Sequence, residues 1–259
     1  MKLKFIIFIL PIILLSPNSL SAANSPEADF AKGNELYSQG NFAAAIESYE
    51  GVRSQGMHSW SLYYNLGNAY YRQQEFGNAI LNYKKALKLN PGNKEIKQNL
   101  DLAESKTEDQ IKPIPELFLR VWWHNIVSLC SPTGWLIWSI ISLALFVVAF
   151  AIGKLRIWPH PAVLRGGLIL ALLSLVLLTL FLTCFKSAQH HITSANEAIV
   201  TQPFTMVMSS PEHNSVEKMT LHEGTTVTIQ ETVGDWYKIQ IADGNSGWLH
   251  RNDITPVTL

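Results

Sequence analysis

Few residues of this sequence are spaced in a way that could carry out a reaction. The sequence contains no Gly-Lys-Ser/Thr phosphate loop, no His-Glu-x-x-His zinc motif, no Gly-x-Ser-x-Gly nucleophile motif and no Cys-x-x-Cys pair. His190 and His191 are adjacent, but no third ligand follows at a spacing that suits a metal ion. We therefore predict a protein that binds other molecules and is not an enzyme, with no catalytic residue, no metal and no cofactor.

Two long apolar runs, residues 135–152 and 167–185, organise the chain. Neither run contains a charged residue, and at about 1.5 Å per residue each approaches the ~30 Å thickness of the hydrocarbon core of a bilayer. The connection between them, residues 153–166, carries lysine and arginine but no acidic residue. Because lysine and arginine mark short cytoplasmic loops, we predict a transmembrane hairpin that turns in the cytoplasm, with both flanking regions on the other side.

The composition argues against several other classes of protein. The 20 lysines and arginines are balanced by 20 acidic residues, so the sequence indicates no surface for nucleic acid. A hydrophobic content of 47% is too low for a polytopic transporter. The two apolar runs also lack the ionisable residues that transport pathways need.

The two cysteines, Cys130 and Cys184, lie near the same end of the expected hairpin. Two cysteines are too few for the disulfide framework of a small secreted domain. On the outer side of the membrane they could form one disulfide, or they could pack as two small apolar thiols. The sequence leaves both alternatives open.

The N-terminus has the features of an export signal. Lys2 and Lys4 precede the apolar run 5–15, and small residues follow up to Ala23. We predict a signal peptide over residues 1–23. An uncleaved anchor is the alternative, and it would place the following domain on the same side of the membrane.

Residues 26–110 contain a repeat with a period of 34 positions. The residue pairs at this separation are Gly33/Gly67, Asn34/Asn68, Leu36/Tyr70, Phe42/Phe76, Ala45/Ala79, Ile46/Ile80 and Tyr49/Tyr83. The period and the residue types resemble the tetratricopeptide repeat, which implies a solenoid of paired helices. The amphipathic segment 94–108 follows as a polar capping helix. Because so short an array is only marginally stable by itself, we expect it to be stabilised by contact with a partner, with the membrane or with a second copy of the chain.

The resemblance implies a groove lined by residues of the first helix of each repeat. These residues are Asn34, Tyr37, Tyr64, Asn65, Asn68, Tyr71 and Arg72. Amide side chains beside aromatic faces suit an extended peptide backbone, and an ordinary solvated helix surface is the alternative. Some family members hold a C-terminal carboxylate with two asparagines and two basic residues. Phe30 and Glu95 stand at the basic positions here, so we predict no such clamp.

Residues 111–134 connect the repeats to the first apolar run. Pro113 and Pro115 interrupt the preceding helix, and Trp122 and Trp123 follow in an apolar stretch. Tryptophan concentrates at membrane–water boundaries. We predict a short interfacial helix along the outer surface of the membrane.

The tail, residues 196–259, alternates short β-type runs with turns that contain glycine and aspartate. Its pattern resembles the bacterial SH3 domain, chiefly around Trp236 and at the pair Gly247-Trp248. The resemblance implies a small all-β barrel, in which Trp236, Tyr237 and Trp248 are candidates for an aromatic binding patch. Some relatives of this domain bind cell-wall peptides, and others only mediate protein contacts.

The order of these parts resembles the BatE-type proteins of the Bacteroides aerotolerance operon. The predicted fold is a multidomain membrane protein with an all-α tetratricopeptide solenoid, a two-helix transmembrane hairpin and a small all-β SH3-like barrel. The resemblance implies a scaffold in the bacterial inner (cytoplasmic) membrane whose N- and C-terminal domains are periplasmic. Its partners would be membrane-anchored von Willebrand A-type Bat proteins in an envelope-stress or aerotolerance complex. The alternative is a peptidoglycan-binding sensor or anchor that acts through the SH3 domain.

Overall fold

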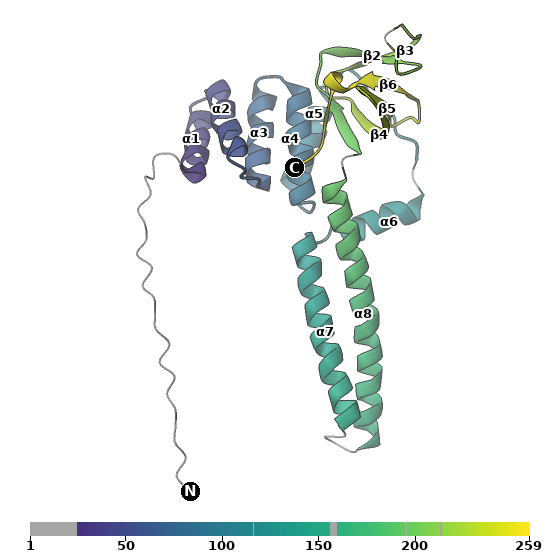
Figure 1. The fold of residues 1–259 in the computed structure, drawn as a ribbon. Helices are drawn as coiled ribbons and strands as arrows, with labels where there is room; N and C mark the ends of the chain where they lie inside the picture. Colours follow the sequence, from purple (N-terminus) through teal and green to yellow (C-terminus); the bar gives the residue numbers. More distant parts are fainter. Residues whose placement is uncertain (1–24, 116, 156–159, 195, 213) are drawn as a thin grey trace.

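The computed structural model of the chain describes residues 25–115, 117–155, 160–194, 196–212 and 214–259. The predicted signal peptide, residues 1–23, lies outside the described residues. A row of helices lies beside a sheet of seven strands, and a long helical hairpin projects from the place where they meet (Figure 1).

The row begins with four helices that pair in sequence order. They are α1 (Pro26–Ser38), α2 (Phe42–Ser54), α3 (Trp60–Arg72) and α4 (Phe76–Leu89), and α5 (Lys94–Glu104) follows them. Side-chain oxygens of Ser25, Ser59 and Asn93 cap α1, α3 and α5. These caps are spaced by the same 34 positions as the repeat. The expected capping helix therefore begins where the first helix of a third repeat would begin.

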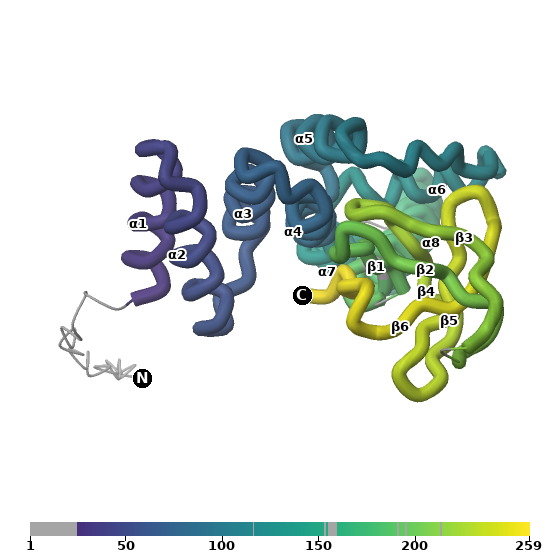
Figure 2. The backbone as a smooth tube through the Cα atoms, turned by 90° about the horizontal axis from the view of Figure 1, so that it is seen from above, coloured from purple at the N-terminus to yellow at the C-terminus, as the bar shows by residue number. Residues whose placement is uncertain are grey.

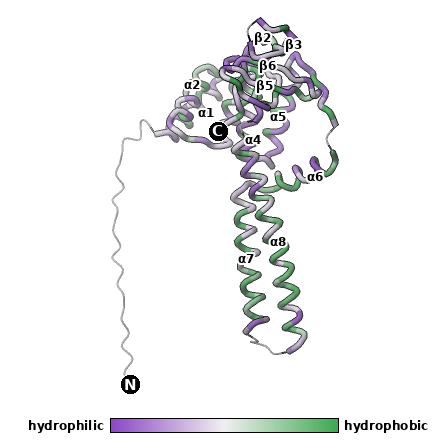
Figure 3. The backbone as a smooth tube through the Cα atoms, turned by 45° about the vertical axis from the view of Figure 1, so that its right-hand side comes forward, coloured by the Kyte–Doolittle hydropathy of each residue, from purple (hydrophilic) through white to green (hydrophobic). Residues whose placement is uncertain are grey.

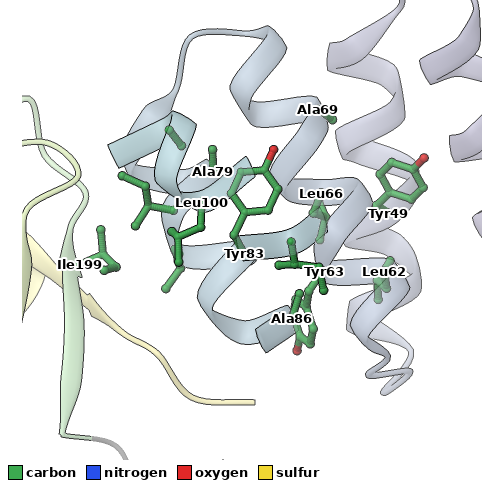
Figure 4. Close-up of a cluster of buried hydrophobic side chains, with 14 of the residues drawn as sticks. Tyr49, Leu62, Tyr63, Leu66, Ala69, Ala79, Tyr83, Ala86, Leu100 and Ile199 are labelled. Carbon is green, nitrogen blue, oxygen red and sulfur yellow. The ribbon is translucent and has the colours of Figure 1, made fainter. Parts of the chain in front are cut away.

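The two helices of each repeat approach one another at a glycine. A Cβ atom on Gly33 would lie 2.5 Å from the Tyr49 ring, and one on Gly67 would lie 2.6 Å from the Tyr83 ring. The absence of a side chain lets each tyrosine ring lie directly against the glycine of the facing helix. Both tyrosines belong to one continuous buried cluster that runs through α2, α3, α4 and α5 (Figure 4).

The hairpin consists of α7 (Pro132–Leu155) and α8 (Pro161–Thr193). Both helices are long and apolar enough to cross a membrane, and only 22% and 17% of their most apolar windows are buried. They are the continuously hydrophobic part of the chain in Figure 3. This exposure differs from that of a core helix in a soluble protein and is compatible with a membrane protein.

The second helix begins earlier than the apolar run indicates. It starts at Pro161, inside the connection expected over residues 153–166, because the His160 side chain accepts a hydrogen bond from the Ala162 N–H and proline is favoured as a first helical residue. Cys130 and Cys184 lie at the other end of the hairpin. Both are free thiols and pack in one cluster with Val127 and Trp135, as expected for two small apolar side chains.

The segment before the hairpin is helical over fewer residues than the range 111–134. Among its described residues, α6 (Phe118–Val127) is helical, and α7 already begins at Pro132. The helix α6 exposes large apolar side chains such as Phe118 and Trp122. The residues ahead of it lie against the sheet, where the Ile114 N–H donates to the Ala242 carbonyl oxygen at 3.0 Å and Ile111 packs on the sheet core. This part of the chain is fixed to the sheet and does not act as a free linker.

The tail forms one antiparallel sheet with the strand order β3-β2-β6-β5-β4-β1-β7. The strands are β1 (Glu197–Val200), β2 (Phe204–Met208), β3 (Glu217–His222), β4 (Thr226–Val233), β5 (Trp236–Gln240), β6 (Ser246–His250) and β7 (Ile254–Pro256), with the short 3-10 helix η2 (Arg251–Asp253) before the last. Gly247 lies where β6 meets β2. A Cβ atom there would come within 2.3 Å of Val207 Cγ1, which explains the glycine of the Gly-Trp pair.

The sheet covers the C-terminal end of the helical row, as the view along the hairpin shows (Figure 2). Ile199 and Val257 are fully buried in the same cluster as the repeat residues. Around them, Lys84 Nζ lies 2.9 Å from Glu197 Oε1, and the Gly77 N–H donates to Glu223 Oε1 at 2.8 Å. We expected a partner, the membrane or a second copy to support the short array, but at this end the support comes from the same chain.

Candidate functional site

A small cavity lies between the first helices of the two repeats. It has a volume of about 130 Å³ and is lined by Asn34, Tyr37, Tyr49, Asn65 and Asn68. The structure thus brings together four of the residues that the sequence assigns to the groove. Tyr49 is an addition, because it comes from the second helix of the first repeat and its ring reaches across Gly33.

The floor of this cavity is a hydrogen-bonded unit of three side chains. Asn34 Oδ1 accepts from the Tyr49 hydroxyl at 2.8 Å and from Asn65 Nδ2 at 2.8 Å. Burial raises the pKa of Tyr49 to about 12, so the phenol is protonated at neutral pH and serves as a donor. The two bonds occupy both lone pairs of the Asn34 carbonyl oxygen.

The same unit recurs one period further along the chain. Asn68 Oδ1 accepts from the Tyr83 hydroxyl at 2.8 Å and from Asn99 Nδ2 at 3.0 Å. Asn99 lies on α5 and stands 34 positions after Asn65. Asn99 and Tyr49 are groove residues that the sequence did not predict, although the repeat period places both beside predicted residues.

Asn34 offers hydrogen-bond donors to the groove. Among the described residues no hydrogen bond from Asn34 Nδ2 is found, whereas the Asn68 amide is engaged with the Tyr64 side chain. The Asn34 carbonyl oxygen already accepts two hydrogen bonds, but its N–H groups are available. The chemical complement of this amide is a carbonyl oxygen, as an extended peptide backbone presents.

Three of the predicted groove residues lie apart from this cavity. The Tyr64 hydroxyl donates to Glu95 Oε1 at 2.7 Å. Tyr71 packs edge-on against Phe76, with 5.6 Å between ring centroids. Arg72 places its guanidinium carbon 4.4 Å above the centre of the Phe42 ring, which is a cation–π contact.

The aromatic residues of the sheet divide between its two faces. The register pairs Trp236 with His250 and Lys238 with Trp248, so these four side chains share one face because alternate residues of a strand point the same way. Tyr237 points to the other face, where it packs on the sheet core. The predicted patch therefore keeps Trp236 and Trp248 together and separates Tyr237 from them.

The chemistry of both regions is that of recognition. In the described ranges of the chain, no three histidine, cysteine, aspartate or glutamate side chains gather as ligands for a metal ion. The groove presents protonated phenols and neutral amides, and the sheet face presents aromatic rings beside a lysine and a histidine. Neither region holds a nucleophile together with a base that could activate it.

Family models match two parts of the chain. Residues 60–93, which cover α3 and α4, match the tetratricopeptide repeat, and residues 209–255, which begin before β3 and end in β7, match the bacterial SH3 domain. A search of curated proteins finds no match to this sequence. The two matches confirm a tetratricopeptide repeat and a bacterial SH3 domain. They indicate binding of proteins or peptidoglycan, in line with a non-catalytic role.

Proposed function

We propose that this protein is a scaffold of the bacterial inner membrane that holds protein partners on the periplasmic side. The observation that carries the proposal is the shared core of the two modules, in which Ile199 and Val257 of the tail are buried among repeat residues. This core fixes the groove and the sheet face in one orientation. A partner that touches both gains effective concentration from the second contact.

The membrane placement rests on the hairpin and its charges. Lys154 and Arg165 lie exposed at the turn end of the hairpin, and the repeats and the sheet lie together at the other end. By the distribution of positive charge, the turn end is cytoplasmic. A reporter enzyme fused after Leu259 should be active in the periplasm, and cytoplasmic activity would contradict this topology.

The order of the modules supports a role of the BatE type. In this proposal the partners are membrane-anchored proteins with von Willebrand A-type domains, and the complex acts in envelope stress or oxygen tolerance. The groove would bind an extended segment of such a partner, with a backbone carbonyl oxygen that accepts a hydrogen bond from Asn34.

The groove can be tested by capture of partners in cells. We would compare the wild type with the double variant Tyr37→Ala and Asn65→Ala, which removes two walls of the cavity and leaves the buried Tyr49 and Tyr83 in place. The control is Glu47→Ala, an exposed change on α2 outside the cavity. Crosslinking followed by purification in detergent should recover about tenfold less partner with the double variant. Equal recovery from all three proteins would exclude the groove as the binding surface.

A second candidate function is an anchor to peptidoglycan. It is favoured by the sheet face on which Trp236 and Trp248 lie together, because aromatic rings stack on the apolar faces of sugars. The test is sedimentation of the full-length protein with purified sacculi, since a tail cut away from the repeats would expose Ile199 and Val257. Cosedimentation that is lost in the double variant Trp236→Ala and Trp248→Ala would favour the anchor over the scaffold.

A further inference from the structure

A larger cavity lies where the repeats, α6 and the hairpin meet. Its volume is about 480 Å³, within the range of small-molecule sites. One wall comes from α4 and α5, and the opposite wall comes from α6 and from the last turns of α8. Neither the groove nor the aromatic sheet face contributes to it.

The charged residues of this lining are mostly basic. The basic side chains that line it are Lys84, Lys88, Lys97, His124 and His190. Glu197 is the acidic residue of the lining, and its carboxylate is held by Lys84 at 2.9 Å. The charge of Glu197 also acts on Lys88, but with three lysines and one carboxylate the lining keeps a net positive charge.

Lys88 is the most informative of these residues because it is buried, with 5% of its surface exposed. Its ammonium group donates to the carbonyl oxygens of Ser194 and Val257 at 2.7 and 2.6 Å, which leaves one N–H. None of the ion pairs among the described residues involves Lys88. Burial lowers the pKa of Lys88, and a bound anion would offset the cost of keeping this charge out of water.

The position of the cavity narrows the choice of anion. Pro132, the first residue of α7, lines it together with Ser187 and Ile192 near the end of α8. These residues mark the end of both apolar helices, where the head groups of a bilayer would lie. Leu87 and Val127 add an apolar surface to the same cavity.

We propose that this cavity binds a phosphate group through the ammonium groups of Lys88 and Lys97. The hydroxyl group of Ser187, whose oxygen accepts from Trp123 Nε1, supplies a further donor, and the apolar lining accommodates the carbon atoms next to the phosphate. The phosphate can come from the head group of an anionic phospholipid or from a soluble phosphate. The lipid source rests on the membrane placement proposed above, whereas the soluble source does not.

The test uses the full-length protein and two probes. In the first arm, inorganic phosphate is titrated against the protein in phosphate-free detergent at constant ionic strength, with chloride as the reference anion. In the second arm, the protein is placed in nanodiscs of phosphatidylcholine with or without one-fifth phosphatidylglycerol. The readouts are the thermal unfolding midpoint and the lipids that mass spectrometry finds retained. We expect at least one probe to raise the midpoint and to bind in a saturable way.

Two matched variants on α5 decide where the anion binds. Lys97→Ala removes a basic group of the cavity, and Lys94→Ala removes an exposed lysine of the same helix outside it. Lys97→Ala should weaken binding about three- to tenfold, and Lys94→Ala should leave it unchanged. Binding of only one probe identifies the source. Failure of both probes, or an equal loss in the two variants, would overturn the proposal while leaving the groove experiment unaffected.

Discussion

The two repeats follow the same residue pattern but bury their residues to very different extents. Within the first repeat, α1 buries only Gly33, whereas α3 of the second repeat buries five residues and α4 buries nine. The second repeat has α2 on one side and α5 with the sheet on the other. The first has a neighbour on one side in the described structure. Burial is therefore set by the neighbours of a repeat as well as by its own sequence, and paired substitutions can measure the difference.

The largest loss of stability is expected when the tyrosine between the two helices of a repeat is replaced by alanine. Tyr83→Ala should destabilise the protein by about 3–5 kcal/mol, because the cavity would be enclosed on all sides and Asn68 would lose a hydrogen-bond donor. Tyr49→Ala should cost about 2 kcal/mol, since the terminal helices can relax into the space. Pulse proteolysis of the full-length protein across a urea series measures both values. Equal losses would show that the terminal repeat is packed as firmly as the inner one.

A slightly smaller loss of stability is expected for substitutions at the end of the array that the sheet covers. Ile199→Ala should cost about 2–4 kcal/mol because Ile199 is fully buried between α4 and the sheet. Phe30→Ala at the open end should cost about 1 kcal/mol, since Phe30 is only partly buried against Tyr49. Hydrogen exchange adds a second readout. Faster exchange in both α4 and β1 of Ile199→Ala is expected, and a change confined to the sheet would contradict a shared core.

The glycines give a third matched pair with a moderate effect. Gly67→Ala forces a methyl group against the Tyr83 ring and should destabilise the protein by about 1–3 kcal/mol. Gly33→Ala makes an equally close contact with Tyr49, but that ring can move outward with the terminal helices. We expect less than half the loss there, measured by the same urea series. A larger loss at Gly33 would reverse the ranking of the two repeats.

The smallest expected change in stability comes from the charged contact that joins the segment after α5 to the sheet. The His222 ring lies 2.8 Å from Asp109 and 3.5 Å from Glu108, and the hydrogen bond with Asp109 raises the pKa of His222 above its usual 6.5. Burial would raise the pKa of Asp109, but the hydrogen bonds from Thr225 and His222 outweigh it, so this pKa falls below 3.8.

The sign of the pH dependence follows from these two shifts. The His222 contribution is fully present below about pH 6.5 and is lost as the pH rises through the raised pKa. The Asp109 contribution is present above about pH 3.8 and is lost as the pH falls through the lowered pKa. The difference in thermal midpoint between the wild type and His222→Gln should therefore decline slightly from pH 6 to pH 9, whereas the lowered pKa of Lys85 acts equally on both proteins. A difference that stays constant with pH would exclude the His222 contribution.

Much of this architecture could be predicted from local patterns. The 34-residue period identifies the repeats, and it continues to Asn93 and Asn99, which mark α5 as the first helix of a further unit. The Gly247-Trp248 pair identifies the sheet domain. Each of these patterns depends on residues that are close in sequence or lie on one pair of strands. Such patterns can be recognised in a single sequence.

The docking of the sheet on the repeats could not be predicted in the same way. Lys84 and Lys88 look like the polar face of an amphipathic helix, yet their partners are Glu197 and two carbonyl oxygens more than 100 positions away. Because every residue has a backbone carbonyl group, the residue types in the sequence do not indicate which carbonyl oxygen accepts a hydrogen bond. The larger cavity between the repeats, α6 and the hairpin depends on the same long-range contacts, so its lining residues could not be predicted from the sequence either.

Val257 follows both the repeats and the hairpin in the sequence, and this order has a consequence for biogenesis. Ribosomes make the repeats first, and the residues of the tail that close their core are made only after the hairpin. The helical row therefore stays partly open until both apolar helices and the strands that follow them have been made. A chain truncated just before β7 should leave the row unfinished and open to proteases, although every repeat residue has been made.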